Sequence, residues 1–447
     1  MKHIPLKITI KKFDGLSVAT LLWLSMSLFL AAARFILTQV GIVDGAVRET
    51  ILFVITCVPF IHLTASGLFS IKEKKMSISA MNFFCLYFVA VFTFFFSLML
   101  NPRLGEFFFR PDYGIGPVFR PDGAIYAFLL FSLFDNPCKI KKVLTKAAFV
   151  FFFFQIFVVF IPAMMRGYWI DIAPDGGVMH SRYSLSFGYD MLLPLTVFLT
   201  EGMQRHKTYY YIFALISAIL IISNGGRGAM VVFFLFLLLL ILISIIDSKT
   251  STIKKIFLII GIVFFTLTFF FFRDDLLTML ISFLTSQKIN SRSIDMLIKG
   301  SFSSYNGRDL IWNAVIDAIR EGGLFGYGMF GDRPFVRPYH IAGYSHNLFL
   351  ELLVSFGIIG AGIIVYILAD AVRMIFFCKD RDWRMIYVIL FTCSSKLMLS
   401  LSFWYVWEFW AAAAIAYKYR SLKSRNSLTE HSVIEKRCQK IEYSSKC

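Results

Sequence analysis

The chain has 447 residues, of which 58% are hydrophobic and 16% are charged, and its formal net charge is +17. This composition excludes an ordinary soluble globular domain and is typical of an integral membrane protein, which has the lipid bilayer as a partner. The positive charge requires no nucleic acid, because inner-face lysines are attracted to anionic lipid headgroups. The seven cysteines fall in apolar runs or lysine-rich segments, so they predict no disulfide framework.

Apolar runs long enough to cross a bilayer recur along the chain, since about 20 residues suffice for one crossing. Membrane helices are expected at 17–40, 49–70, 79–100, 122–135, 147–165, 187–203, 208–224, 229–246, 256–272, 346–370, 385–401 and 403–418. The count is about twelve, or about ten if the short fourth run and part of the first do not cross. The sequence therefore predicts an all-α polytopic membrane protein, with residues 1–447 forming a single membrane domain.

Basic residues predict the orientation of these helices, because lysine and arginine resist translocation. They place both termini inside, with 419–447 as a cytoplasmic tail. Lysines dominate the predicted inner segments, whereas arginines dominate the outer ones. A planar guanidinium grips phosphate or carboxylate with two parallel hydrogen bonds. The outer arginines therefore predict a phosphorylated or acidic ligand on that face.

The tripeptide Arg-Pro-Asp occurs twice in and just after the first long outer segment, 101–121. The first copy starts at Arg110 and the second at Arg120. Proline restricts the backbone to extended or turn geometry. The repeat fits a rigid hairpin that presents two arginines, or a turn whose charges form surface ion pairs.

The second outer segment, 166–186, places aromatic residues near Arg166 and Arg182. Three aromatics, Trp169, Tyr183 and Tyr189, fit stacking on sugar rings beside these arginines. They also fit the aromatic belt that gathers at membrane interfaces.

The third outer segment, 273–345, is the largest interruption of the apolar pattern and precedes the tenth expected helix. Residues 308–319 have apolar positions at helical spacing, which predicts an amphipathic helix on this outer loop. Asn306 is expected to cap its start, and the glycines at 322–323 to end it.

Arg308 opens this amphipathic helix, Trp312 lies one turn later, and His346 follows at the start of the next membrane helix. A neutral imidazole in that place can accept a proton from a hydroxyl nucleophile. A histidine there also fits a hydrogen-bonded helix cap. His340, in the preceding loop, is the nearest competitor for the same role.

Glycine and arginine motifs accompany these residues. They are Ser223-Asn224-Gly225-Gly226-Arg227-Gly228, Gly307-Arg308, Trp312, Leu324-Phe325-Gly326-Tyr327-Gly328, His346-Asn347, Gly357 and Gly360. Together they resemble the core of the O-antigen polymerase and O-antigen ligase family. The resemblance is specific over about 223–228 and 307–360, and it is loose over the other helices.

The resemblance implies a pocket on the outer face of the bacterial inner membrane. There a glycan passes from undecaprenyl pyrophosphate to an acceptor hydroxyl, without a cofactor and without a metal ion. Arg227 and Arg308 would neutralise the departing pyrophosphate, and His346 would orient or deprotonate the acceptor. Further candidates for substrate binding are Arg166, Arg182, Arg320, Trp312, Tyr327 and Asn347, of which Trp312 and Tyr327 also fit a structural role.

The family contains two activities. A polymerase joins repeat units, with a chain-length regulator protein as a conceivable partner, whereas a ligase moves the finished chain onto lipid A core. Arg166 and Arg320 are each followed by glycine after ten intervening residues, a spacing that resembles polymerase loops. The sequence therefore favours a polymerase, with a ligase as the alternative.

A flippase for lipid-linked oligosaccharide is the alternative from another class, because twelve helices with both ends inside is a common transporter layout. Charges within membrane helices mark transport pathways, and Glu351, Lys396 and Glu408 lie in or beside apolar runs. Lys396 and Glu408, however, fit a structural ion pair. A single large outer loop also departs from the repeated halves that transporters have.

Overall fold

The computed structural model describes residues 15–41, 78–110, 113–172, 178–181, 184–224, 226–247, 308–339 and 343–424, with isolated positions between 47 and 61 and at 251, 278, 279 and 282. Within these residues the chain is mostly helical, and four helices are long and apolar enough to cross a membrane: 78–100, 137–166, 227–246 and 348–377. This supports a polytopic membrane protein. The count of twelve spans stays a prediction, because 256–272 and most of 49–70 lie outside the described residues, as does most of 273–307.

The first part of the chain forms helices and short helical turns. These are α1 (Gly15–Leu24), α2 (Met26–Gln39), α4 (Ile78–Leu100), η1 (Pro102–Leu104), α5 (Gly105–Phe108), α6 (Ile115–Phe119) and α7 (Tyr126–Ser132). Two expectations need correction here. The single helix expected at 17–40 is interrupted at Ser25, and the helix expected at 122–135 is reduced to α7. Gly123 donates to Arg120 in a turn before α7, and Asn136 already caps the next helix, which leaves little room for a longer one.

The middle of the chain contains the longest rod and a small hairpin. Its elements are α8 (Pro137–Phe154), η2 (Gln155–Phe160), α9 (Ile161–Arg166), β1 (Trp169–Ile172), β2 (Val178–Ser181), α10 (Leu185–Asp190), α11 (Leu192–Arg205), α12 (Thr208–Asn224) and α13 (Arg227–Ile246). Helix α8 begins at Pro137, ten residues before the expected 147. At its other end it continues through a π-helical turn into α9. The antiparallel pair β1 and β2 is an exception to the all-α prediction.

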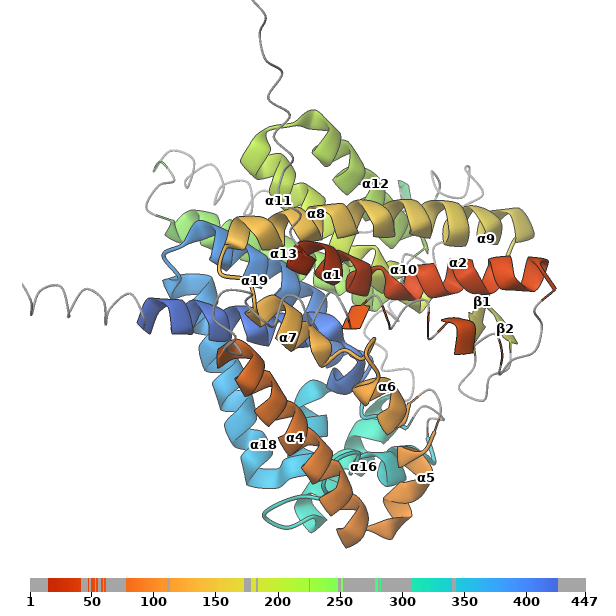
Figure 1. Ribbon diagram of the computed structural model, residues 1–447, viewed down its shortest axis with the longest axis vertical. Helices are drawn as coiled ribbons and strands as arrows, with labels where there is room; N and C mark the ends of the chain where they lie inside the picture. The colour runs from red at the N-terminus through yellow and green to blue at the C-terminus, as the bar shows by residue number, and fades with distance from the viewer. Residues whose placement is uncertain are drawn as a thin grey trace, which may run out of the picture.

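Aromatic side chains fill the space between α8, α11 and α12. The ring of Phe149 lies 4.7 Å from that of Phe198 and 5.3 Å from that of Phe213, with the second pair edge to face. Such contacts matter in a bilayer, where close packing takes over the role that water exclusion has elsewhere. Figure 1 shows α8 and α9 as one long helix across the view, with α1 packed along α8.

The last part of the chain carries the outer amphipathic helix and the final membrane helices. Its elements are α16 (Arg308–Glu321), α17 (Arg333–Val336), α18 (Leu348–Val372), η3 (Arg373–Phe377), α19 (Arg381–Ser394), η4 (Ser395–Met398), η5 (Phe403–Tyr405) and a helix at 407–424. The amphipathic helix is confirmed, although its expected cap, Asn306, lies outside the described residues. The helix expected at 385–401 ends at Ser394, and the next one continues past the expected 418.

Helix α18 is broken within the membrane at Gly357, whose φ of 53° and ψ of −124° are not helical. The break exposes two carbonyls to the loop that follows α16. Tyr327 N–H donates to Val354 O at 2.9 Å, and Gly328 N–H donates to Ser355 O at 2.8 Å. In return Ile358 N–H donates to Leu324 O at 2.9 Å. The loop is therefore attached to the membrane helix by backbone hydrogen bonds.

We expect Gly357→Ala to detach this loop from α18. A Cβ at Gly357 would overlap the carbonyl of Leu324, and the positive φ is unfavourable for alanine. The combined strain should cost at least about 2 kcal/mol, measured as a lower midpoint of thermal unfolding for the purified protein. Gly362→Ala is the matched control, because a Cβ there meets nothing within 4 Å. Equal midpoints for the two variants would contradict the pairing.

Candidate active site

The residue before His346 is held from two sides. Trp312, on α16, donates its indole N–H to Ser345 O at 3.1 Å. Asp332 accepts the Ser345 N–H at 2.8 Å through Oδ2. Asn347 then caps α18, accepting from Phe349 N–H at 3.0 Å. Three separate segments thus fix the backbone on either side of His346.

His346 is buried, with 6% of its surface exposed, and has a positive φ of 52°. A left-handed conformation is unfavourable for a residue other than glycine, so the clamped neighbours have to maintain it. The imidazole lies edge-on to the ring of Tyr344, with 4.5 Å between ring centroids. The side chain is therefore held in one orientation just before the N-terminal end of α18.

Asp332 and Arg333 form a fully buried pair beneath this segment, and reasoning from the sequence missed it. Arg333 is 1% exposed, and its Nε lies 3.7 Å from Asp332 Oδ1. Its guanidinium lies over the rings of Phe330, at 4.7 Å, and Tyr344, at 5.5 Å. Among the described residues its three nitrogens make no hydrogen bond. In the sequence, Asp332 and Arg333 are two adjacent charged residues in a polar loop, and nothing in that pattern indicates that they are buried.

Burial and charge act in opposite directions on this pair. Burial raises the pKa of the Asp332 carboxyl, and it outweighs the Arg333 guanidinium and the Ser345 hydrogen bond, which lower that pKa. Burial lowers the pKa of Arg333, but the acidic groups around it, Asp332 first and then Tyr405 and Glu351, together outweigh burial and leave that pKa raised. Arg333 therefore stays charged and depends on Asp332 for compensation.

Arg227 and Arg308 are the first residues of α13 and α16, where helix N–H groups favour anions. Both charges act on the hydroxyl of Tyr189, and Arg308 also acts on Tyr344. Tyr189 packs so closely on Gly228 that a Cβ there would overlap its hydroxyl. The two arginines and the Tyr344-His346 segment therefore belong to one region of the protein.

Two other predicted arginines, Arg166 and Arg320, are described by the structure and are exposed. Arg166 is exposed at the end of α9, with its guanidinium 5.9 Å from the ring of Tyr168. Arg320 is exposed and paired with Asp317 at 3.1 Å, twelve residues along α16 from Arg308, which is about 18 Å. Arg182 lies outside the described residues. A substrate role for these three stays a prediction.

The remaining candidates have structural contacts. Tyr327 packs against Phe335, with 4.8 Å between ring centroids, and burial followed by the charge of Glu321 raises its pKa. Trp169 is 3% exposed and lies 4.9 Å from the ring of Phe187. Of its two readings, burial counts against stacking on sugar, because the side chain is already covered by protein.

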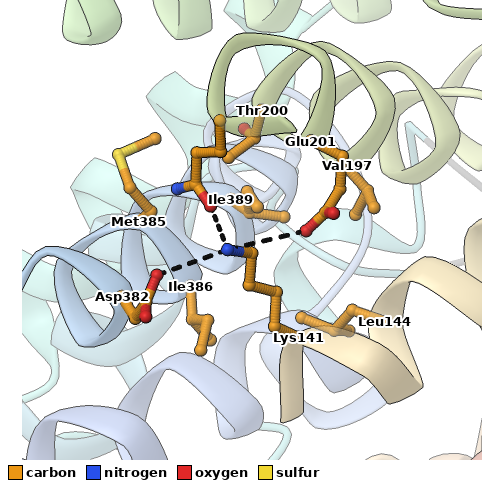
Figure 2. A pocket seen from close by; sticks show the side chains of 10 residues that line it. Lys141, Leu144, Val197, Thr200, Glu201, Asp382, Met385, Ile386 and Ile389 are labelled. Carbon is orange, nitrogen blue, oxygen red and sulfur yellow. Dashed lines mark hydrogen bonds and ion pairs between the residues drawn. The ribbon is translucent and has the colours of Figure 1, made fainter. Parts of the chain in front are cut away.

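A second polar cluster lies where α8, α11 and α19 meet, on the predicted inner side. Figure 2 shows Lys141 reaching toward Asp382, at 3.3 Å, and Glu201, at 3.8 Å. It also donates to Gln204. The cavity between these side chains is about 10 Å³, enough for about one water molecule. We interpret the cluster as an ionic brace between three helices.

Comparison with known proteins identifies a family for the part of the chain that contains the two arginines and His346. Residues 212–365 match the family model described as O-antigen ligase. This part of the chain is an O-antigen ligase family domain. It contains Arg227, Arg308 and His346, and it supports glycan transfer of the O-antigen ligase or polymerase type without separating the two. No curated protein and no solved structure matches the chain significantly.

We expect Asp332→Asn to destabilise this O-antigen ligase family domain. Asparagine can still accept from Ser345, but Arg333 would be left buried without a counter-charge, which costs about 3–5 kcal/mol. Thermal unfolding of the purified protein measures the loss. Asp317→Asn, which removes an exposed ion pair on the same loop, should cost no more than about 1 kcal/mol. Similar losses in both variants would count against a buried charge pair.

Proposed function

We propose that this protein transfers a glycan from undecaprenyl pyrophosphate to an acceptor sugar hydroxyl at the outer face of the bacterial inner membrane. The observation that carries the proposal is that one region joins the two helix-opening arginines to the clamped His346. The O-antigen ligase family match covers all three residues. We assign the chain as a repeat-unit polymerase.

In the proposed reaction, the acceptor oxygen attacks the anomeric carbon of the donor sugar. The bond from that carbon to the pyrophosphate oxygen breaks, and lipid pyrophosphate leaves with its bonding electrons. His346 accepts the proton of the acceptor hydroxyl. Arg227 and Arg308 stabilise the developing negative charge as fixed cations, with no cofactor or metal ion assigned to the step. Direct displacement inverts the anomeric centre.

The ligase alternative differs only in the acceptor. A ligase would use lipid A core instead of a second lipid-linked repeat unit, and the family match is compatible with either acceptor. The flippase alternative depended on intramembrane charge. Lys396 and Glu408 form an ion pair at 2.9 Å, as the sequence predicted, so they give no specific support to a transport pathway.

We expect Arg308→Lys to lose most glycan transfer. Lysine keeps the charge but loses the two-pronged hydrogen bonding to pyrophosphate, so the rate should fall at least about tenfold. Transfer by the reconstituted protein measures this. Arg337→Lys is the control, because Arg337 lies on the same loop, exposed and paired with Glu106 at 2.5 Å. Full activity in Arg308→Lys would remove Arg308 from the mechanism.

Reconstitution with lipid-linked repeat units alone should separate the activities. A product ladder on a gel with wild type, and none with His346→Ala, is the result expected for a polymerase whose base is His346. Transfer that appears only after lipid A core is added would instead indicate a ligase. If an active donor gives no transfer to any acceptor, the proposed chemistry is wrong and transport gains support.

A further inference from the structure

A cavity of about 330 Å³ lies beside the end of α10 and the Lys396-Glu408 pair. Its lining includes Asp190, Lys396, Glu408, Trp23 and Trp407. It adjoins the arginine region, because Lys396 acts on the hydroxyl of Tyr189 together with Arg227 and Arg308. The volume is at the lower end of the range for ligand pockets, about 300–1,000 Å³.

Glu408 lines the cavity with a carboxylate of which only one oxygen has a hydrogen-bond partner among the described residues. The side chain is 5% exposed, and its Oε1 accepts from Lys396 Nζ at 2.9 Å. Its Oε2 is buried and has no hydrogen-bond partner among the described residues. A buried acceptor without a donor is unfavourable, so a ligand hydroxyl that donates to this oxygen would bind favourably.

The charge of the lining disfavours the pyrophosphate end of a donor. Asp122, Asp190 and Glu408 supply three carboxyl groups against the single ammonium of Lys396, and Arg120 lies 3.2 Å from Asp122. Carboxylates accept hydrogen bonds and repel phosphate. Tryptophan offers a broad apolar surface that can pack on the C–H face of a sugar ring. Trp23 and Trp407 both line the cavity, with their ring centroids 6.3 Å apart and nearly perpendicular.

We propose that this cavity, between the break of α1 and α2 and the Lys396-Glu408 pair, binds a hydroxyl-rich sugar of the glycan substrate. The inference rests on the proposed function for the identity of the substrate. The carboxyl groups of Glu408 and Asp190 accept sugar hydroxyls, and the tryptophans contact the ring. Phosphate is held on the arginine side of Tyr189, so the two ends of a lipid-linked sugar are distinguished by opposite charge.

The test is a crossed binding experiment on the full-length protein in lipid nanodiscs. One probe is the free repeat-unit oligosaccharide, released from the lipid by mild acid, and the other is inorganic pyrophosphate. Glu408→Gln replaces the unpartnered acceptor with a donor, and it should weaken oligosaccharide binding about tenfold or more while leaving pyrophosphate within about twofold. Arg308→Gln should do the reverse. Titration calorimetry measures both.

A second variant guards against misfolding, because Glu408→Gln leaves Lys396 buried without its counter-ion. Trp407→Leu introduces no buried charge and should also weaken oligosaccharide binding while sparing pyrophosphate. Unchanged oligosaccharide binding in the folded variants, or no binding in wild type, would overturn the inference even if transfer is intact. Loss of pyrophosphate binding in the Glu408 variant would also overturn it. Cavity-dependent oligosaccharide binding without any transfer would instead refute the proposed reaction and keep the sugar site.

Discussion

The constraint on which the rest of this structure depends is that a bilayer offers no hydrogen-bond partners to an irregular backbone. Each break in a membrane helix therefore has to be completed by another part of the protein. At Gly357 the freed carbonyls of Val354 and Ser355 are taken by the loop after α16. The break between α19 and the last helix is completed differently, since the carboxyl of Glu351 accepts from the Ser402 hydroxyl and from Phe403 N–H at 3.4 Å. These two solutions join the outer loop, α18 and the 395–406 segment into one unit.

The same constraint explains why charge is buried around that unit. A buried ion pair is seldom more stable than well-packed apolar residues, but removing one partner is very costly. Such a pair therefore adds little net stability and strongly penalises any rearrangement that separates its partners. Asp332 restrains the structure through two contacts. It forms the buried ion pair with Arg333, and it accepts the N–H of Ser345. In the proposed reaction, this double role would keep His346 in place while a substrate enters and leaves.

Sequence reasoning succeeded where a local pattern determines the structure. Helix α16 was predictable because its apolar spacing and terminating glycines act within one short segment. The Lys396-Glu408 pair was predictable because two opposite charges at adjacent ends of apolar runs have few other partners. The breaks at Ser25 and Gly357 were not, because a serine or glycine in an apolar run is equally compatible with an unbroken helix. Their positions depend on which loop packs against them, and that is a tertiary property.

Part of the candidate site could be predicted from the sequence, and part of it could not. Its two arginines and its histidine could be found because they belong to short motifs that resemble the O-antigen polymerase and ligase family, with His346 just before α18. The acidic cavity could not be found, because its lining comes from five parts of the chain that have no common motif. Yet a lipid-linked sugar presents an anionic end and a hydroxyl-rich end, and a site with only the arginines would attract any phosphate. Discrimination needs a neighbouring surface that repels phosphate and accepts hydroxyl protons. The carboxyl groups beyond Tyr189 supply such a surface, and Lys396, which acts on both sides, marks where the two environments meet.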